Sequence, residues 1–132
     1  MFEEFELEDN DDDIGGVAGS MAEEGLAPPE ASDICLGHER AEKLLLKLYN
    51  ADQLPHAVAL SGPKGIGKAT FAYRFAKFLL HEDENASGAL FDGDAAAGAE
   101  SFSIPTDSST FRKVSSGGHP DLLSVKRHYD DI

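Results

Sequence analysis

Apolar residues recur every three or four positions in two stretches of the chain, a spacing that places them on one face of a helix. In the stretch from residue 38 to about residue 50, charged residues lie off a stripe formed by Ala41, Leu44, Leu45 and Leu48. In the second stretch, which the polar residues 81–85 end, the apolar positions are Phe71, Ala72, Phe75, Phe78 and Leu79. The sequence therefore predicts two amphipathic helices, each burying one face.

Two shorter apolar runs have the length of buried strands. Residues 56–60 (HAVAL) precede a glycine-rich segment, and residues 122–125 (LLSV) follow a turn at 119–121. Because each run is too short for a helix and is bounded by turn-forming residues, we expect a strand at each. Strand, glycine loop and helix follow one another as in a P-loop nucleotide-binding domain. The expected fold is therefore α/β with a parallel sheet, which is incomplete because two strands and two helices cannot build a sheet covered on both faces.

The glycine-rich segment fits the pattern Gly-x-x-x-x-Gly-Lys of a phosphate-binding loop. In such a loop the glycines let successive backbone N–H groups turn toward an anion at the N-terminus of the next helix. The candidate nucleotide-binding residues are Gly62, Pro63, Lys64, Gly65, Ile66, Gly67, Lys68, Ala69 and Thr70. Lys68 is expected to reach the β- and γ-phosphates as a point charge. An ordinary glycine turn between a strand and a helix is the alternative interpretation.

The residue after the lysine departs from the pattern, because a Ser or Thr hydroxyl normally binds Mg²⁺ there and Ala69 has none. Thr70 lies about 100° further round a helix and is not an automatic substitute. The acidic pair Asp130 and Asp131 follows a polar run, and not the buried apolar strand that precedes the second acidic motif of a P-loop hydrolase. The sequence thus assigns no catalytic residue and no metal ligand. It leaves ATP binding open and predicts Mg²⁺ only if ATP binds.

Charge is distributed unevenly along the 132 residues. The formal net charge is −14, and residues 1–33 hold 12 acidic residues and no basic ones. Residues 34–132 hold 11 basic and 13 acidic residues, which gives this part a net charge of −2. Because residues 1–33 can bury little apolar surface, we expect them to form a disordered acidic tail. The nearly neutral remainder shows no basic patch for autonomous nucleic-acid binding.

Residues 85–118 are a second region of biased composition, rich in Ala, Gly, Ser and Asp. A structureless connection of this length is unusual in a compact domain, so we expect a flexible insertion within a domain that spans 34–132. Cys35 is the only cysteine, which excludes an intramolecular disulfide and a cysteine-cluster zinc site. The chain has neither a secretory signal nor an apolar run of membrane-spanning length, so we expect a cytoplasmic protein without membrane contact.

Four segments, taken in order, resemble one protein family. They read LGHERAE at 36–42, LPHA at 54–57, GPKGIGKATFAYRFA at 62–76 and GHPDLL at 118–123. Together they resemble the N-terminal part of the delta-prime subunits of bacterial DNA polymerase III, which are clamp-loader proteins of the AAA+ class. The resemblance implies that residues 34–132 form the first part of an AAA+/RecA-like P-loop domain.

The resemblance also implies a function and partners. Delta-prime subunits act mainly as rigid, structural members of a pentameric loader, which opens the sliding clamp and places it on primed DNA during replication. The implied partners are the delta and gamma/tau subunits and, indirectly, the sliding clamp and the DNA. The family's phosphate loop commonly departs from the ATPase consensus, as Ala69 does. Many relatives carry a cysteine zinc module after the loop's helix, but residues 85–118 contain no cysteine, so no zinc is expected.

Two other functions remain open. An active ATPase motor of the gamma/tau type would have to hold Mg²⁺ without a hydroxyl at Ala69. A small nucleotide kinase similar to adenylate kinase also has a non-hydroxyl residue after the lysine of its loop. Such a kinase should carry an arginine-rich lid, and none is visible in the sequence.

Overall fold

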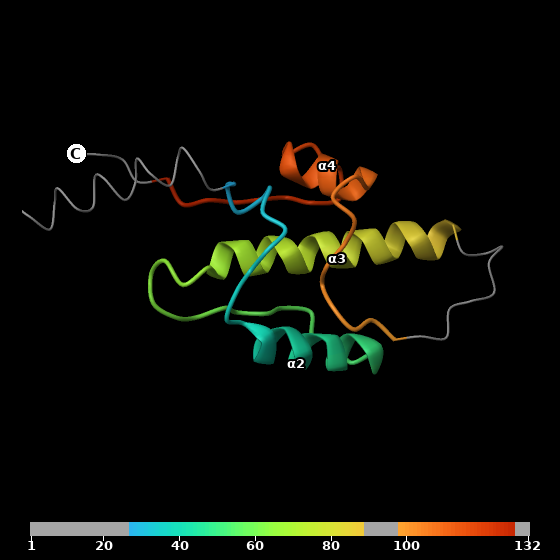
Figure 1. Cartoon of the computed structure of the whole chain (residues 1–132), viewed down its shortest axis with the longest axis horizontal. Helices are drawn as coiled ribbons and strands as arrows, with labels where there is room; N and C mark the ends of the chain where they lie inside the picture. The colour runs from blue at the N-terminus through green and yellow to red at the C-terminus, as the bar shows by residue number, and fades with distance from the viewer. Residues whose placement is uncertain (1–26, 89–97, 129–132) are drawn as a thin grey trace, which may run out of the picture.

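Three helices form the regular structure of the residues that the computed structural model describes, which are 27–88 and 98–128. α2 spans Glu39–Asn50, α3 spans Lys68–Gly88 and α4 spans Ser109–Ser115. α3 is the longest helix and lies between α2 on one side and α4 on the other (Figure 1). Within the described ranges, none of the helices combines the length and the apolar character needed to cross a membrane.

The prediction of an α/β fold with an AAA+/RecA-like parallel sheet is wrong, because the described residues contain no strand and no sheet. Residues 56–60 and 122–125 have no regular secondary structure, and α3 runs between them, so they lie on opposite sides of this helix (Figure 1). A strand needs a neighbouring strand for its N–H and C=O groups, and neither run has the other within reach. Apart from the half-buried Leu122, both runs are exposed to solvent, as the 85% exposure of Leu123 illustrates.

Aromatic side chains form the centre of the core. Phe102 is only 1% exposed, and its ring centroid lies 5.7 Å from that of Phe71, 5.0 Å from that of Phe75 and 5.3 Å from that of Phe78. From α2, Tyr49 meets Phe78 edge to face at 5.0 Å between centroids. Since each buried aromatic ring contributes on the order of 1.5–3 kcal/mol through burial, this cluster is the main apolar contact between α2, α3 and the segment around residue 102.

The buried face of α2 differs from the predicted stripe. Leu46 is buried, whereas Leu44 is 59% exposed. Glu42, which we expected to lie away from the core, forms an ion pair with Arg74 of α3 at 3.5 Å and accepts the backbone N–H of Phe102 at 2.7 Å. The helix is therefore oriented by polar contacts with two other segments as well as by its apolar stripe.

α3 is longer than its apolar pattern. The polar residues 81–85 were expected to end it, but it continues to Gly88. One of these polar residues, Glu84, accepts a hydrogen bond from Thr110 Oγ1 at 2.6 Å and faces Lys113 Nζ at 3.8 Å, both on α4. The last turns of α3 are therefore held by polar contacts with α4, and hydrophobic periodicity does not predict such contacts.

Part of the expected flexible insertion at 85–118 is packed into the fold. Its described portion from residue 98 contains α4 and three buried apolar side chains, which are Phe102, Ile104 and Val114. Asn50, at the end of α2, fixes the start of this portion through hydrogen bonds with the N–H and C=O of Ala99 at 2.9 and 2.8 Å. Ser108 caps α4 by accepting a backbone N–H of its first turn. The polar composition thus includes specific capping and pairing residues.

The expected acidic tail falls mostly outside the described residues, as do Asp130 and Asp131. Its last residues, 27–33, contact the fold. Ser115 Oγ donates to the carbonyl O of Glu30 at 3.3 Å, and Lys77 Nζ donates to that of Ser32 at 2.9 Å. The chain therefore joins the packed part of the molecule a few residues earlier than the predicted boundary at residue 34.

Candidate functional site

The glycine loop that the sequence predicts lies immediately before α3. Gly65 and Gly67 have φ angles of 82° and 97°, a region of backbone conformation that residues with a side chain rarely adopt. α3 begins at Lys68 and is 21 residues long, so the positive end of its dipole stands at the loop. Glycines with positive φ before a helix N-terminus are the backbone arrangement that binds anions in phosphate loops.

Lys68 folds back over this loop. Its Nζ donates to the carbonyl O of Gly62 at 2.5 Å and to that of Pro63 at 3.0 Å. The two bonds hold the ammonium group beside the loop, where it can neutralise a bound anion. A phosphate in the loop would compete with these two carbonyl oxygens for the Nζ donors.

Two side chains from the segment before α2 pack against the loop from outside. His38 Nε2 donates to the carbonyl O of Ile66 at 2.6 Å, since a carbonyl can only accept. Cys35 Sγ lies 3.9 Å from the carbonyl O of Gly67. A Cβ at Gly67 would lie 3.5 Å from His38 Nε2 and 3.7 Å from Cys35 Sγ. At Gly67 the loop is therefore closely packed against His38 and Cys35, two residues that lie outside the predicted site.

The Cys35 thiol is partly covered by this packing. Burial raises the pKa of Cys35, so the neutral thiol is the form that the fold favours near neutral pH. A neutral thiol suits its contact with a backbone carbonyl. We therefore interpret Cys35 as a packing residue and not as a nucleophile.

The remaining predicted loop residues are more open to solvent. Pro63, Lys64 and Ile66 are exposed, and so is Ala69 in the first turn of α3, while Thr70 is half-buried beside it. The chain brings the predicted residues together because they are consecutive. The position directly after Lys68 offers no hydroxyl group, as the sequence predicts.

A cavity of about 310 Å³ lies between this loop and α2. Its lining includes His38, Ala41, Leu60, Ile66, Lys68 and Phe71. Apolar side chains thus border a cationic loop. This arrangement suits a ligand that joins a phosphate to a less polar group.

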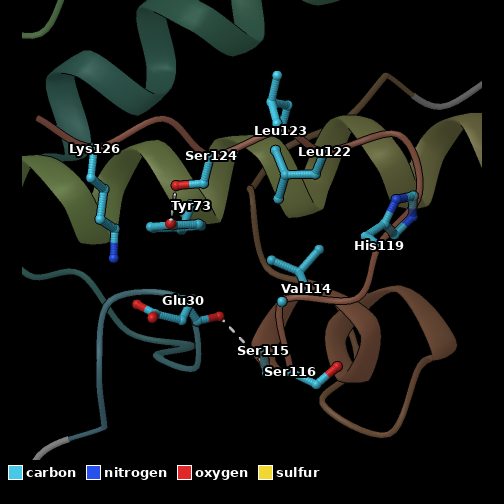
Figure 2. A pocket seen from close by; sticks show the side chains of 11 residues that line it. Glu30, Tyr73, Val114, Ser115, Ser116, His119, Leu122, Leu123, Ser124 and Lys126 are labelled. Atoms are coloured by element: carbon cyan, nitrogen blue, oxygen red, sulfur yellow. Dashed lines mark hydrogen bonds between the residues drawn. The ribbon is translucent and has the colours of Figure 1, made fainter.

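A larger cavity, of about 520 Å³, lies against α4 and contains none of the predicted site residues. In Figure 2, Val114 and Leu122 point toward each other across it, and Leu123 points away. The hydroxyl groups of Tyr73 and Ser124 are hydrogen-bonded at 2.9 Å on its wall. Its lining includes Leu122, Leu123 and Ser124, which belong to the run 122–125 that the sequence predicts as a strand.

His119 beside this second cavity has a structural role. It is buried, and its Nδ1 accepts the backbone N–H of Asp121 at 3.2 Å. The proton therefore lies on Nε2, which faces Glu84 Oε1 at 3.5 Å. This geometry agrees with the interpretation of residues 119–121 as a turn.

Nothing in residues 27–88 and 98–128 groups three His, Cys, Asp or Glu side chains closely enough to hold a metal ion. Comparisons of the chain with protein-family models, curated proteins and solved structures gave no match. The candidate site is therefore defined by the geometry of the loop and by the residues that surround it.

Proposed function

We propose that this chain is a cytoplasmic clamp-loader subunit of the DNA polymerase III type, which contributes structurally to loading the sliding clamp on primed DNA. The observation that carries the proposal is the loop at 62–68. There, glycines with positive φ, the Lys68 ammonium and the N-terminus of α3 converge. The four segments that resemble delta-prime subunits, in the family's order, support the assignment to a loader.

The loop is proposed to bind phosphate groups without driving hydrolysis. ATP hydrolysis in a P-loop protein uses Mg²⁺ held by a hydroxyl directly after the lysine, together with a residue that positions the attacking water. Ala69 supplies no hydroxyl, and the sequence offers no placed base. We therefore expect nucleotide to act here as a structural ligand.

Isothermal titration with Mg-ATP and with inorganic pyrophosphate tests the loop. We expect both to bind, and Lys68→Ala to weaken each affinity by about tenfold or more, because a charge-assisted contact with phosphate is lost. Lys43→Ala removes an exposed lysine from α2 and is the matched control, with unchanged binding expected. Absence of binding by the unmodified chain would contradict the proposal. Turnover of ATP would favour the gamma/tau-type motor, and phosphoryl transfer to a nucleoside monophosphate would favour the kinase.

Co-purification with delta and gamma/tau subunits tests the assembly. We expect the chain to enter a complex with them, in competition with an authentic delta-prime subunit. If the chain binds phosphate but fails to associate under conditions in which delta-prime does, the loader assignment falls and the phosphate site stands.

A further inference from the structure

We propose that His38 is a positioning residue for the phosphate loop, which aims the backbone N–H of Gly67 at the bound pyrophosphate group. This inference rests on the proposed phosphate binding and adds a determinant that lies outside the loop. His38 directly precedes α2 and is separated from Ile66 by 28 positions in the chain, yet its Nε2 donates to the carbonyl O of Ile66 at 2.6 Å.

The contact of His38 with the Ile66 carbonyl also fixes the direction of the Gly67 N–H. The carbonyl of Ile66 and the N–H of Gly67 belong to the same planar trans peptide, so they point in opposite directions. A hydrogen bond that fixes the carbonyl toward His38 therefore fixes the N–H on the opposite side of the loop. Because His38 bonds the carbonyl of Ile66, the N–H of Gly67 is left to bind an anion.

The loop needs such an external bond because its own sequence does not hold this peptide. Gly67, with φ at 97°, follows the peptide directly, and Gly65, with φ at 82°, lies just before Ile66. Glycine populates both signs of φ with similar ease, so this peptide can rotate at little cost in the isolated loop. Fixing it before the ligand arrives removes an ordering cost from binding.

His38 is itself held in place. Its ring meets that of Phe71, in the first turn of α3, edge to face at 5.9 Å between centroids. A Cβ on Gly67 would lie 3.5 Å from its Nε2, so the ring stands directly behind the loop. The His38 imidazole thus connects the start of α2, the loop and the first turn of α3 through a single side chain.

Three substitutions separate hydrogen-bond donation from packing. In His38→Gln the amide nitrogen lies the same number of bonds from Cα as Nε2 does, whereas in His38→Asn it lies one bond closer. His38→Met keeps an apolar contact with Phe71 and removes the donor. With inorganic pyrophosphate as the probe, we expect the Gln variant to bind within about twofold of the unmodified chain. We expect the Asn and Met variants to bind about tenfold or more weakly, as loss of one hydrogen bond to a charged group predicts.

The amide proton of Gly67, followed by NMR, provides a readout that loss of packing alone does not produce. On addition of pyrophosphate it should move downfield in the unmodified chain and in His38→Gln, and stay in place in His38→Asn and His38→Met. Urea unfolding of all four proteins identifies any variant that loses its fold, and whichever of His38→Asn and His38→Met stays folded is then compared with His38→Gln.

The outcomes distinguish the two proposals. If the unmodified chain binds pyrophosphate and the Asn and Met variants bind it equally well, the role of His38 is wrong and the phosphate site stands. If the Gln variant is folded but loses binding with the others, donation by Nε2 is not the cause and the inference is again overturned. If the unmodified chain binds neither pyrophosphate nor ATP, both proposals fail.

Discussion

Lys77 illustrates how a single residue can take a place that its type does not predict. It lies among apolar positions of α3, where a lysine is expected to reach solvent, yet it is only 2% exposed. Its Nζ donates to the carbonyl O of Ser32 at 2.9 Å and lies 4.2 Å from the ring centroid of Phe111. Burial lowers the pKa of Lys77 below its ordinary value of 10.5, because the charged form loses hydration.

The pH dependence of stability tests this burial. Between the lowered pKa of the folded state and 10.5, the unfolded chain binds more protons at Lys77, so stability rises with pH in that window. We expect the free energy of unfolding of the unmodified chain, relative to that of Lys77→Met, to increase as the pH is raised toward 10.5. Urea unfolding of both proteins at several alkaline pH values measures it. A difference that does not change with pH would show that the amine titrates normally.

At the scale of elements, Glu84 connects α3 to α4. Its carboxylate accepts hydrogen bonds from Thr110 Oγ1 at 2.6 Å and Ser109 Oγ at 3.3 Å. The bond from Thr110 and the nearby Lys113 ammonium hold the pKa of Glu84 below its ordinary value of 4.5. The carboxylate form is therefore the form that binds the two helices together.

Removal of this charge should destabilise the chain in a pH-dependent way. Because the folded-state pKa lies below 4.5, the contribution of Glu84 is fully present above 4.5 and is lost as the pH falls through the folded-state value. We expect Glu84→Gln to unfold at a lower urea concentration than the unmodified chain near neutral pH, with the difference shrinking in acid. Glu100→Gln, at an exposed position, is the control and should change little.

The segment around Phe102 behaves as an element of the core although it has no regular structure. We expect Phe102→Ala to lower the free energy of unfolding by about 3–5 kcal/mol, because three neighbouring phenylalanine rings lose their contact with it. Leu123→Ala removes a side chain that is 85% exposed and should change the free energy of unfolding by less than about 0.5 kcal/mol. Equal effects in urea unfolding would mean that residues 98–108 do not pack as described.

At the scale of the whole molecule, the described residues bury few apolar side chains and expose many. The buried ones are Leu45, Leu46, Phe71, Phe78, Phe102, Ile104 and Val114. Large apolar side chains on the exposed surface include Ile34, Leu36, Leu44, Val58, Leu60, Ile66, Leu123 and Val125. Since burial of apolar surface is the main favourable term in folding, this balance implies low stability.

Thermal unfolding of the 132-residue chain tests this implication. We expect a broad transition of low enthalpy, followed by circular dichroism and calorimetry, because a small core gives weak cooperativity. Addition of pyrophosphate should raise the midpoint if it binds the folded state alone. A sharp, two-state transition in the absence of any ligand would contradict the low stability.

Sequence reasoning succeeded where the signal is local. The first helix was predicted at 38–50 and is observed at Glu39–Asn50, and Leu45, Phe71 and Phe78 are buried as predicted. A helix after the glycine loop was also predicted, because glycine spacing and helical periodicity are both visible in a short window, and α3 begins at Lys68. The predicted end of α3 at residues 81–85 is wrong, because polar contacts with α4 stabilise the helix beyond its apolar positions, to Gly88.

The sequence by itself determined two helices and a loop of glycines ending in Lys68, because backbone freedom and apolar spacing are properties of neighbouring residues. Only the tertiary structure decided that residues 56–60 and 122–125 lie on opposite sides of α3 and form no sheet. It also decided that Glu42 contacts Arg74 and the segment at Phe102, that Lys77 is buried and that His38 packs behind the loop. Such contacts join residues far apart in the chain, and no short pattern encodes which of them meet.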